Sequence, residues 1–240
     1  MSSVEIVEVG PFKRNRPKVI TGFAGAGFVG NTAVMHIVRE KGFKLRAQVR
    51  SHMIPAMMLL VDGEPTHPFR IYGDEGGELL FVSNAVLISP ENAWPLGLKL
   101  MEWLTKAGVR EIVAIEGMPF AIQPGERPIY GFGVPVRDLN QFGASPIREG
   151  GVSGLNAVML EESMKQGIPF VTLMVPTPFA SAMDYGGAIP VVEVLNKMFK
   201  LGVDVTPLKE RAEMVRKSLE RTGAVRRRGF LSSLRGSQPT

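Results

Sequence analysis

The fold of this chain is set by a glycine-rich stretch near its N-terminus, which reads Val19-Ile20-Thr21-Gly22-Phe23-Ala24-Gly25-Ala26-Gly27-Phe28-Val29-Gly30. Residues 18–23 form a short apolar run that is typical of a buried strand, and residues 31–41 carry apolar side chains at helical spacing. The stretch therefore predicts a strand, a tight turn and a helix. In open α/β sheets this crossing lies at the edge of the sheet where ligands bind.

Three glycines of this stretch, Gly25, Gly27 and Gly30, match the G-x-G-x-x-G pattern of dinucleotide-binding folds. That pattern is normally followed about 20 residues later by an acidic residue that binds the ribose, and residues 43–50 contain none. Lys44 and Arg46 in that segment could instead meet a 2′-phosphate. Two other interpretations stay open: the glycines let the helix pack closely on the strand, or the helix N-terminus is an anion site.

The composition excludes several kinds of chemistry. The chain has no Cys, which excludes disulfides, thiolate metal sites and a cysteine nucleophile. It contains neither the G-x-x-x-x-G-K-[ST] phosphate loop nor the G-x-S-x-G nucleophile elbow, and its three histidines lack metal-ligand spacing. We therefore expect no catalytic residue, no metal and no cofactor.

Charge and hydropathy limit the partners. No run of about 18 apolar residues occurs and the first residues do not resemble a signal peptide, so we expect a cytoplasmic protein with no membrane contact. Five arginines and no acid lie in residues 221–240, and they account for the whole net charge of +5. Residues 1–220 are therefore neutral, and we expect no nucleic-acid binding. We predict a single domain over residues 1–222 and a basic, disordered tail over residues 223–240.

The order of the predicted elements indicates the fold class. Strands are expected within residues 4–10, 18–23, 47–51, 70–72, 78–82, 111–116, 134–137 and 170–175, and helices from the glycine turn to residue 41 and over 95–107, 155–166, 187–200 and 206–222. Alternation of strands and helices is typical of β-α-β units. The sequence predicts an α/β domain with a mostly parallel sheet between helices, followed by an appended C-terminal helix.

The carboxyl ends of the predicted strands point to one candidate ligand cleft. Loops at 25–30, 116–119, 150–156 and 176–187 are all expected at that edge of the sheet. Ser153 either caps the following helix or acts as a nucleophile, and Glu116 could serve as an acid or base. The candidate cleft residues are Gly25, Gly27, Gly30, Glu116, Ser153, Gly154 and Asn156.

A second candidate surface is the methionine-rich segment of residues 53–61. Its candidate interface residues are Met53, Ile54, Met57 and Met58. Methionine is flexible and adapts to irregular apolar contacts. Two interpretations stay open: the segment is a core strand, or it is exposed and forms an oligomer interface.

The order and spacing of several motifs resemble a known family. They are the glycine turn at 22–30, Val152-Ser153-Gly154-Leu155-Asn156 before a helix, Pro176-Thr177-Pro178 after a strand, and Gly202-Val203-Asp204-Val205-Thr206-Pro207-Leu208 before the final helix. Over residues 17–220 the chain resembles the proteasome assembly chaperone family in its archaeal form, whose members are sometimes labelled ATP-grasp enzymes by name.

The resemblance implies a three-layer α/β/α fold akin to nucleoside phosphorylases. It also implies a homo-oligomer that acts as an assembly chaperone or scaffold on proteasome α subunits or a related complex, without catalysis. Some relatives end in a hydrophobic–Tyr–any-residue tail that inserts between α subunits, whereas this chain ends in Gln238-Pro239-Thr240. The alternative is an enzyme or a nucleotide- or nucleoside-binding protein that uses the Gly25–Gly30 turn.

Overall fold

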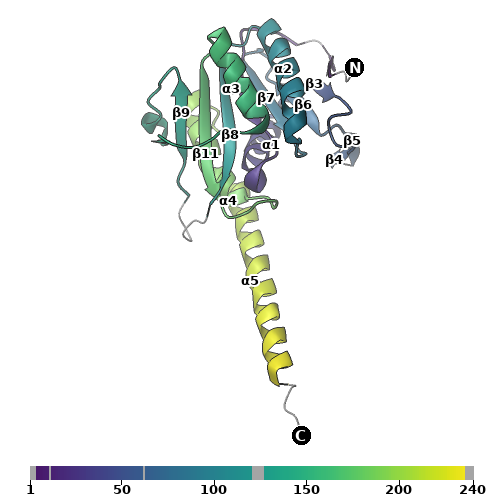
Figure 1. Cartoon of the computed structure of the whole chain (residues 1–240), viewed down its shortest axis with the longest axis vertical. Coiled ribbons are helices and arrows are strands. Elements are labelled where there is room, and N and C mark those ends of the chain that lie inside the picture. Colours follow the sequence, from purple (N-terminus) through teal and green to yellow (C-terminus); the bar gives the residue numbers. More distant parts are fainter. Residues whose placement is uncertain (1–3, 11, 62, 121–126, 236–240) are drawn as a thin grey trace.

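A nine-stranded sheet with helices on both faces forms the body of the protein (Figure 1). The structure is a computed structural model that describes residues 4–10, 12–61, 63–120 and 127–235, with only the backbone for 222–235. In chain order the elements are β1 (Glu5–Glu8), β2 (Lys18–Gly22), the 3-10 helix η1 (Ala26–Phe28), α1 (Val29–Lys41), β3 (Lys44–Arg50), β4 (Leu59–Val61), β5 (Glu64–Thr66), β6 (Phe69–Gly73), β7 (Leu79–Asn84), α2 (Pro90–Lys106), β8 (Glu111–Pro119), β9 (Tyr130–Val134), η2 (Asn140–Phe142), β10 (Ser145–Pro146), α3 (Gly154–Gln166), β11 (Phe170–Thr177), α4 (Tyr185–Phe199) and α5 (Thr206–Arg235).

The sheet is mixed, with parallel strands at its centre. Its order is β1-β3-β6-β7-β2-β8-β11-β9-β10, and the adjacent strands β7, β2, β8 and β11 run parallel. Towards one edge, β6 pairs antiparallel with β7, β3 with β6, and β1 with β3. A short turn joins β6 to β7. The α/β class is confirmed. The predicted parallel character holds for the central strands, while β9 also pairs antiparallel with β11.

Two helical layers cover the two faces of the sheet. One core lies between the sheet and α1 and α4, and the start of α5 adds Leu208 to it. The other core lies between the sheet and α2 and α3. These buried apolar clusters stabilise the body because each removes a large area from water. The three-layer α/β/α arrangement implied by the resemblance is confirmed.

Close backbone contacts explain most of the glycines at the first crossing. A Cβ on Gly22 would lie 2.2 Å from the carbonyl oxygen of Gly30, and a Cβ on Gly117 would lie 2.0 Å from that of Ala26. A Cβ on Gly30 would lie 3.0 Å from the carbonyl oxygen of Ile115. The glycines therefore let α1 and its preceding turn pack directly on β2 and β8, which is the packing interpretation of the motif.

Three element boundaries differ from the predicted ones. Helix α2 begins at Pro90, a favoured residue for a first helical turn, and not at Pro95. Strand β9 lies at 130–134 and not at 134–137, because it pairs with β11 there. Helix α5 continues from residue 222 to Arg235, where we predicted a disordered tail. Arginine is a good helix former, which fits a helical backbone through Arg226–Arg228. Residues 236–240 of the predicted tail lie outside the described residues.

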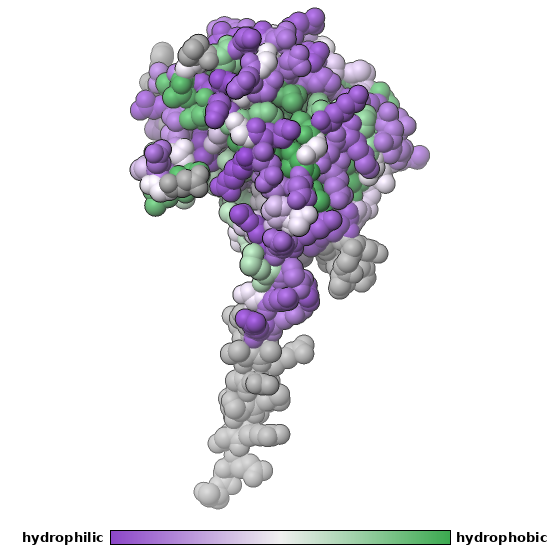
Figure 2. Space-filling model, turned by 180° about the vertical axis from the view of Figure 1, so that it is seen from behind, coloured by the Kyte–Doolittle hydropathy of each residue, from purple (hydrophilic) through white to green (hydrophobic). Residues whose placement is uncertain are grey.

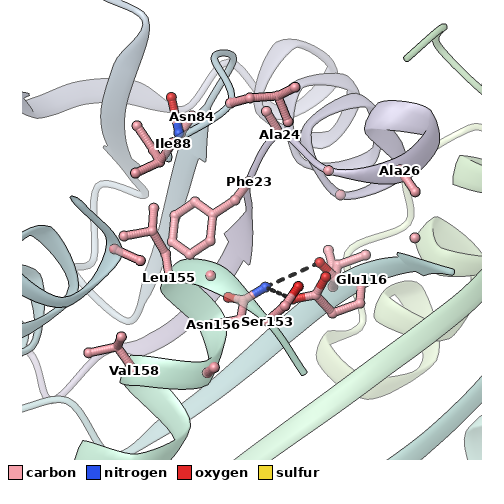
Figure 3. A pocket seen from close by; sticks show the side chains of 18 of the residues that line it. Phe23, Ala24, Ala26, Asn84, Ile88, Glu116, Ser153, Leu155, Asn156 and Val158 are labelled. Atoms are coloured by element: carbon pink, nitrogen blue, oxygen red, sulfur yellow. Dashed lines mark hydrogen bonds between the residues drawn. The ribbon is translucent and has the colours of Figure 1, made fainter. Parts of the chain in front are cut away.

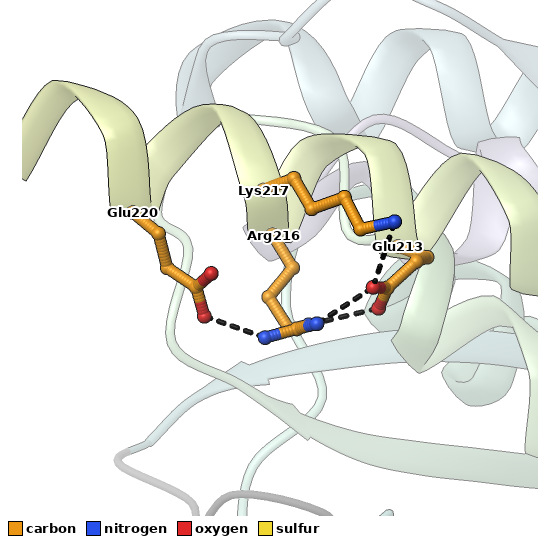
Figure 4. Close-up of polar contacts among 4 residues, drawn as sticks. All are labelled: Glu213, Arg216, Lys217 and Glu220. Carbon is orange, nitrogen blue, oxygen red and sulfur yellow. Dashed lines mark hydrogen bonds and ion pairs between the residues drawn. The ribbon is translucent and has the colours of Figure 1, made fainter.

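Helix α5 leaves the body as a long rod (Figure 1). Near its base Arg216 pairs with Glu213 at 2.6 Å and with Glu220 at 2.5 Å, and Lys217 lies 3.5 Å from Glu213 (Figure 4). These spacings of three and four residues place the side chains on neighbouring turns of one helix. The pairs are exposed, so they add little to the stability of the fold.

Candidate functional site

A cleft of about 570 Å³ lies at the carboxyl edge of the parallel strands. Its lining comes from the residues just after β2 and β7, from the end of β8, and from the first turns of α1, α2 and α3. Helix α1 covers one face of the sheet and α2 and α3 cover the other. The cleft thus occupies the position where open α/β sheets commonly bind ligands.

Six of the seven predicted cleft residues line this cleft: Gly25, Gly30, Glu116, Ser153, Gly154 and Asn156. Gly27 does not. It has φ +63°, and a Cβ there would lie 2.5 Å from the hydroxyl oxygen of Thr177, so Gly27 serves the turn and its packing. Gly25 has no atom within 4 Å of its ideal Cβ position, which leaves it open to the cleft.

The prediction that four loops meet at this cleft was wrong for the fourth. Pro178, Asp184 and Tyr185 line a separate groove of about 520 Å³ between α4 and the base of α5. The reason is that Asp184 begins α4 on the face of the sheet opposite α3, where its side chain accepts a hydrogen bond from the backbone N–H of Gly187 at 2.9 Å.

A chain of side-chain hydrogen bonds forms the polar floor of the cleft. The Thr21 hydroxyl donates to Asn156 Oδ1 at 2.8 Å, and Asn156 Nδ2 donates to Glu116 Oε1 at 2.7 Å. The same nitrogen lies 3.4 Å from the backbone oxygen of Ile115. Figure 3 shows Asn156 reaching from α3 to Glu116 on β8. Thr21 and Asn156 are both buried, so this chain holds the Glu116 carboxyl group in one orientation.

The environment of Glu116 changes its protonation. Burial raises the pKa of Glu116 from its ordinary 4.5 to about 7, and the hydrogen bond from Asn156 acts in the opposite direction. Burial is the larger cause because it removes water from the charged form. Near neutral pH, Glu116 therefore exists in both protonation states.

Apolar side chains form the walls of the cleft. They are Phe23, Leu87, Ile88, Trp94, Ile115, Leu155 and Val158. Leu87 is 57% exposed and Trp94 45% exposed, so both lie at its rim. Sequence reasoning missed residues 84–94 because it began the helix at Pro95, so no part of α2 before that residue was considered for the cleft. Ser89-Pro90, a serine before a proline at a helix start, was the signal that could have found this wall.

The described residues that line the cleft include no Lys, Arg or His. Lys44 and Arg46, which we considered for a 2′-phosphate, lie on β3 and line a different hollow with Phe12. The 2′-phosphate interpretation was wrong, because β3, the strand after α1, is separated from β2 by β6 and β7 and so lies away from the glycine turn. Ser153 is the N-cap residue of α3, but its hydroxyl makes no capping hydrogen bond.

Neither a metal-binding cluster nor a membrane-spanning helix occurs among the described residues. No group of three or more His, Asp or Glu side chains in the described ranges is arranged to hold a metal ion. Within those same ranges, no helix combines the length and the apolar character that crossing a membrane requires.

The methionine-rich segment is divided between core and surface. Met53 is 7% and Ile54 6% exposed, and both pack in the core beneath α2. Met57 is 50% and Met58 59% exposed, just before the β4–β5 hairpin, where Leu60 is also exposed. Met53 and Ile54 are thus buried in the core, although not in a strand, whereas Met57 and Met58 are exposed; an oligomer interface at the exposed half stays a prediction.

The comparison with protein families covers most of the chain. The model of the PAC2 family matches residues 19–222. The chain belongs to the PAC2 family. A curated relative in this comparison, an uncharacterised protein of Methanocaldococcus jannaschii, is 25% identical over 224 residues, which are 92% of this chain and 91% of that protein.

Solved structures of PAC2-like proteins share this fold over nearly their full length. PbaA of Pyrococcus furiosus, described as an archaeal homolog of proteasome-assembly chaperone, aligns with a TM-score of 0.82 and 26% identity, covering 97% of both chains. PbaB of the same organism, described as an archaeal proteasome activator, aligns with a TM-score of 0.79 and 22% identity over 93% of this chain and all of PbaB. The similarity to PbaB shows the fold alone.

Proposed function

We propose that this PAC2 protein is a homo-oligomeric assembly chaperone or scaffold that acts on proteasome α subunits or a related complex, in the cytoplasm and without catalysis. The observation that carries the proposal is the match to PbaA across 97% of both chains at 26% identity. A match of that extent includes the final helix as well as the body of the fold. PbaA is described as an archaeal homolog of proteasome-assembly chaperone, which is the reason for proposing a proteasome-related client.

An exposed apolar surface supports the expectation of protein contacts. Met57, Met58 and Leu60 are between 50% and 75% exposed and lie together before and on the β4–β5 hairpin. On the face seen in Figure 2, apolar residues reach the surface in patches between polar ones. Exposed apolar side chains that gather in one place are typical of surfaces that bind other proteins.

The alternative function has less support. An enzyme or nucleotide-binding protein that uses the Gly25–Gly30 turn would need groups that hold phosphate or activate a nucleophile. Gly27 and Gly30 instead accommodate close packing. No His, Lys or Arg is present among the described lining residues of the cleft.

Light scattering coupled to size-exclusion chromatography tests the proposal directly. The full chain is run alone and then mixed with proteasome α subunits from the same source. The expected result is a homo-oligomer that co-elutes with the α subunits. A chain that stays monomeric and never co-elutes with the α subunits contradicts the proposal. A homo-oligomer that does not bind the α subunits would show that the client belongs to a different complex.

Charge substitutions in the exposed methionines test where the oligomer forms. We expect the double variant Met57→Asp with Met58→Asp to shift the chain to a smaller species, while its free energy of unfolding at concentrations where both chains are monomeric stays that of the wild type, because both side chains are exposed in the protomer. Met164→Asp on α3 is the matched control, since Met164 is 59% exposed, as Met58 is. If the double variant keeps the mass of the wild type, the hairpin surface is not the interface.

A further inference from the structure

The proposed chaperone function assigns no role to the cleft. The charged side chains that line the cleft are all acidic among the described residues. Two carboxylates line it, Glu116 and Glu161, and no cationic side chain of the described lining residues accompanies them. Glu161 is exposed and already pairs with Lys165 at 2.8 Å. Glu116 has no ion-pair partner within 4.0 Å among the described residues. Glu116 is therefore the one of these two carboxylates whose charge is not already paired.

The orientation of Glu116 is fixed before any ligand arrives. Oε1 accepts the hydrogen bond from Asn156, and Thr21 holds Asn156 from the other side. The second oxygen, Oε2, forms no hydrogen bond or ion pair with the described residues, and it is not fully buried. A carboxylate with one oxygen held and one oxygen available can pair with a cation with little loss of side-chain freedom.

The walls of the cleft are suited to an apolar body. Phe23 and Leu155 lie inside, and Leu87 and Trp94 lie at the partly exposed rim (Figure 3 shows Phe23 and Leu155). The volume of about 570 Å³ is within the range of small-molecule sites, which combine apolar walls with a few placed polar groups. Aromatic faces also attract organic cations through their ring quadrupoles.

We propose that the cleft binds a small organic ammonium ion, whose charge pairs with the free oxygen of Glu116 and whose apolar or aromatic body lies against Phe23, Leu87 and Trp94. This site is separate from the proposed protein contacts at the β4–β5 hairpin. Failure of this proposal would leave the chaperone proposal as it stands.

The helix ends around the cleft act against this preference, and they define the competing outcome. The N-termini of α1 and α3 face the cleft with no acidic residue in their first turns, and each carries a partial positive charge of about half a unit. These ends favour an anion, whereas the ionised Glu116 side chain repels one. A ligand series that changes only charge separates the two possibilities.

The protonation of Glu116 gives the binding a pH dependence. Asn156, the hydrogen-bond partner of Glu116, does not titrate. Glu161 is the other titratable group among the described lining residues. Burial raises the pKa of Glu116 to about 7, and an ammonium ion binds the ionised form. Affinity for a permanently cationic ligand should therefore rise with pH from 6 to 8.

Isothermal titration calorimetry with three indoles provides the test. Tryptamine, 3-methylindole and indole-3-propionate share one aromatic body and carry charges of +1, 0 and −1 at pH 8. We expect tryptamine to bind at least tenfold more tightly than 3-methylindole, and indole-3-propionate to bind most weakly. We also expect the affinity for tryptamine to fall at pH 6.

Two cleft variants and one control variant locate the effect. Glu116→Gln keeps the shape and can still accept the hydrogen bond from Asn156, so the fold should persist while the affinity for tryptamine falls to that for 3-methylindole. Glu40→Gln, an exposed residue on α1 that does not line the cleft, is the matched control and should leave every affinity unchanged. Trp94→Ala should weaken all three ligands, because it shortens the apolar wall.

Three results would overturn the proposal. They are the absence of measurable binding by all three indoles, tightest binding by indole-3-propionate, and an affinity for tryptamine that Glu116→Gln leaves unchanged. The melting temperature of each variant, measured alongside, shows whether a lost affinity reflects the cleft or the fold.

Discussion

The cleft at the carboxyl edge is enclosed by its neighbours, whereas half of the methionine-rich segment is exposed to solvent. In the cleft, Thr21 and Asn156 are buried and hydrogen-bonded, and the apolar walls enclose a hollow. In the segment, Met53 and Ile54 anchor the chain in the core, while Met57 and Met58 turn outwards. The first arrangement suits a small ligand, and the second suits a protein surface.

The difference between the two regions comes from their neighbours. The end of β8, the segments after β2 and β7, and the first turns of α1, α2 and α3 close around the cleft, so its polar groups need internal partners. The methionine segment precedes a separate two-stranded hairpin, β4–β5, which is not part of the nine-stranded sheet. Apolar side chains beyond the last core contact therefore remain exposed. The predictions below test this contrast.

The largest effect on stability is expected from substituting a tightly packed glycine, and an open glycine serves as its control. Gly117→Ala places a Cβ 2.0 Å from the carbonyl oxygen of Ala26, and we expect a loss of about 3 kcal/mol or more in the free energy of unfolding. Gly25→Ala meets no atom within 4 Å and should change it by less than about 0.5 kcal/mol. Urea denaturation measures both. Equal midpoints for the two variants would show that η1, the turn before α1, does not pack on β8 as described.

The next effect separates the two halves of the methionine segment. Met53→Ala removes a side chain that is 7% exposed, and we expect a loss of about 2 to 4 kcal/mol in unfolding free energy. Met58→Ala removes one that is 59% exposed and should cost less than about 0.5 kcal/mol in the protomer. Both values come from urea denaturation at low protein concentration. A large loss of unfolding free energy for Met58→Ala in the monomeric protein would show that Met58 is buried in the core.

A smaller effect is expected from the titration of Glu116. Its pKa is raised to about 7 in the folded protein from an ordinary 4.5, so between these values the folded state holds more protons than the unfolded state. The contribution of Glu116 is therefore greatest below pH 4.5 and is lost as the pH rises to 7, by roughly 2 to 3 kcal/mol.

Glu116→Gln should flatten this dependence, because glutamine stays neutral. Thermal unfolding from pH 5 to pH 8 measures the difference between the variant and the wild type. The melting temperature of Glu116→Gln should rise relative to that of the wild type as the pH rises, whereas Glu40→Gln should follow the wild-type curve. Parallel curves for Glu116→Gln and wild type would show that Glu116 titrates as an ordinary exposed carboxyl group.

Much of the fold could be predicted because local patterns carried it. The apolar run before Gly22, the helical spacing after Gly30 and the helix signals at Thr206-Pro207 each led to an element that the structure contains. The candidate cleft residues came from one rule about the carboxyl ends of strands, and six of the seven lie around one hollow. What the cleft binds stays a prediction.

Other features could not be read from local patterns. The loop at 176–187 shares an edge of the sheet with the cleft, but the face on which α4 packs takes Asp184 to a different groove. Nothing in the spacing of Met53, Ile54, Met57 and Met58 shows which of them a helix will cover. The aromatic wall at Trp94 depends on α2 starting at Pro90.

The sequence by itself determined the α/β class, the tight glycine crossing and the absence of cysteine chemistry, because periodicity, turn residues and composition are local properties of the chain. The tertiary structure alone decided that Asn156 holds Glu116, that the walls of the cleft are apolar, and which methionines stay exposed. These depend on contacts between residues far apart in sequence, such as Thr21 and Asn156, and only the packing of helices on the sheet brings such residues together.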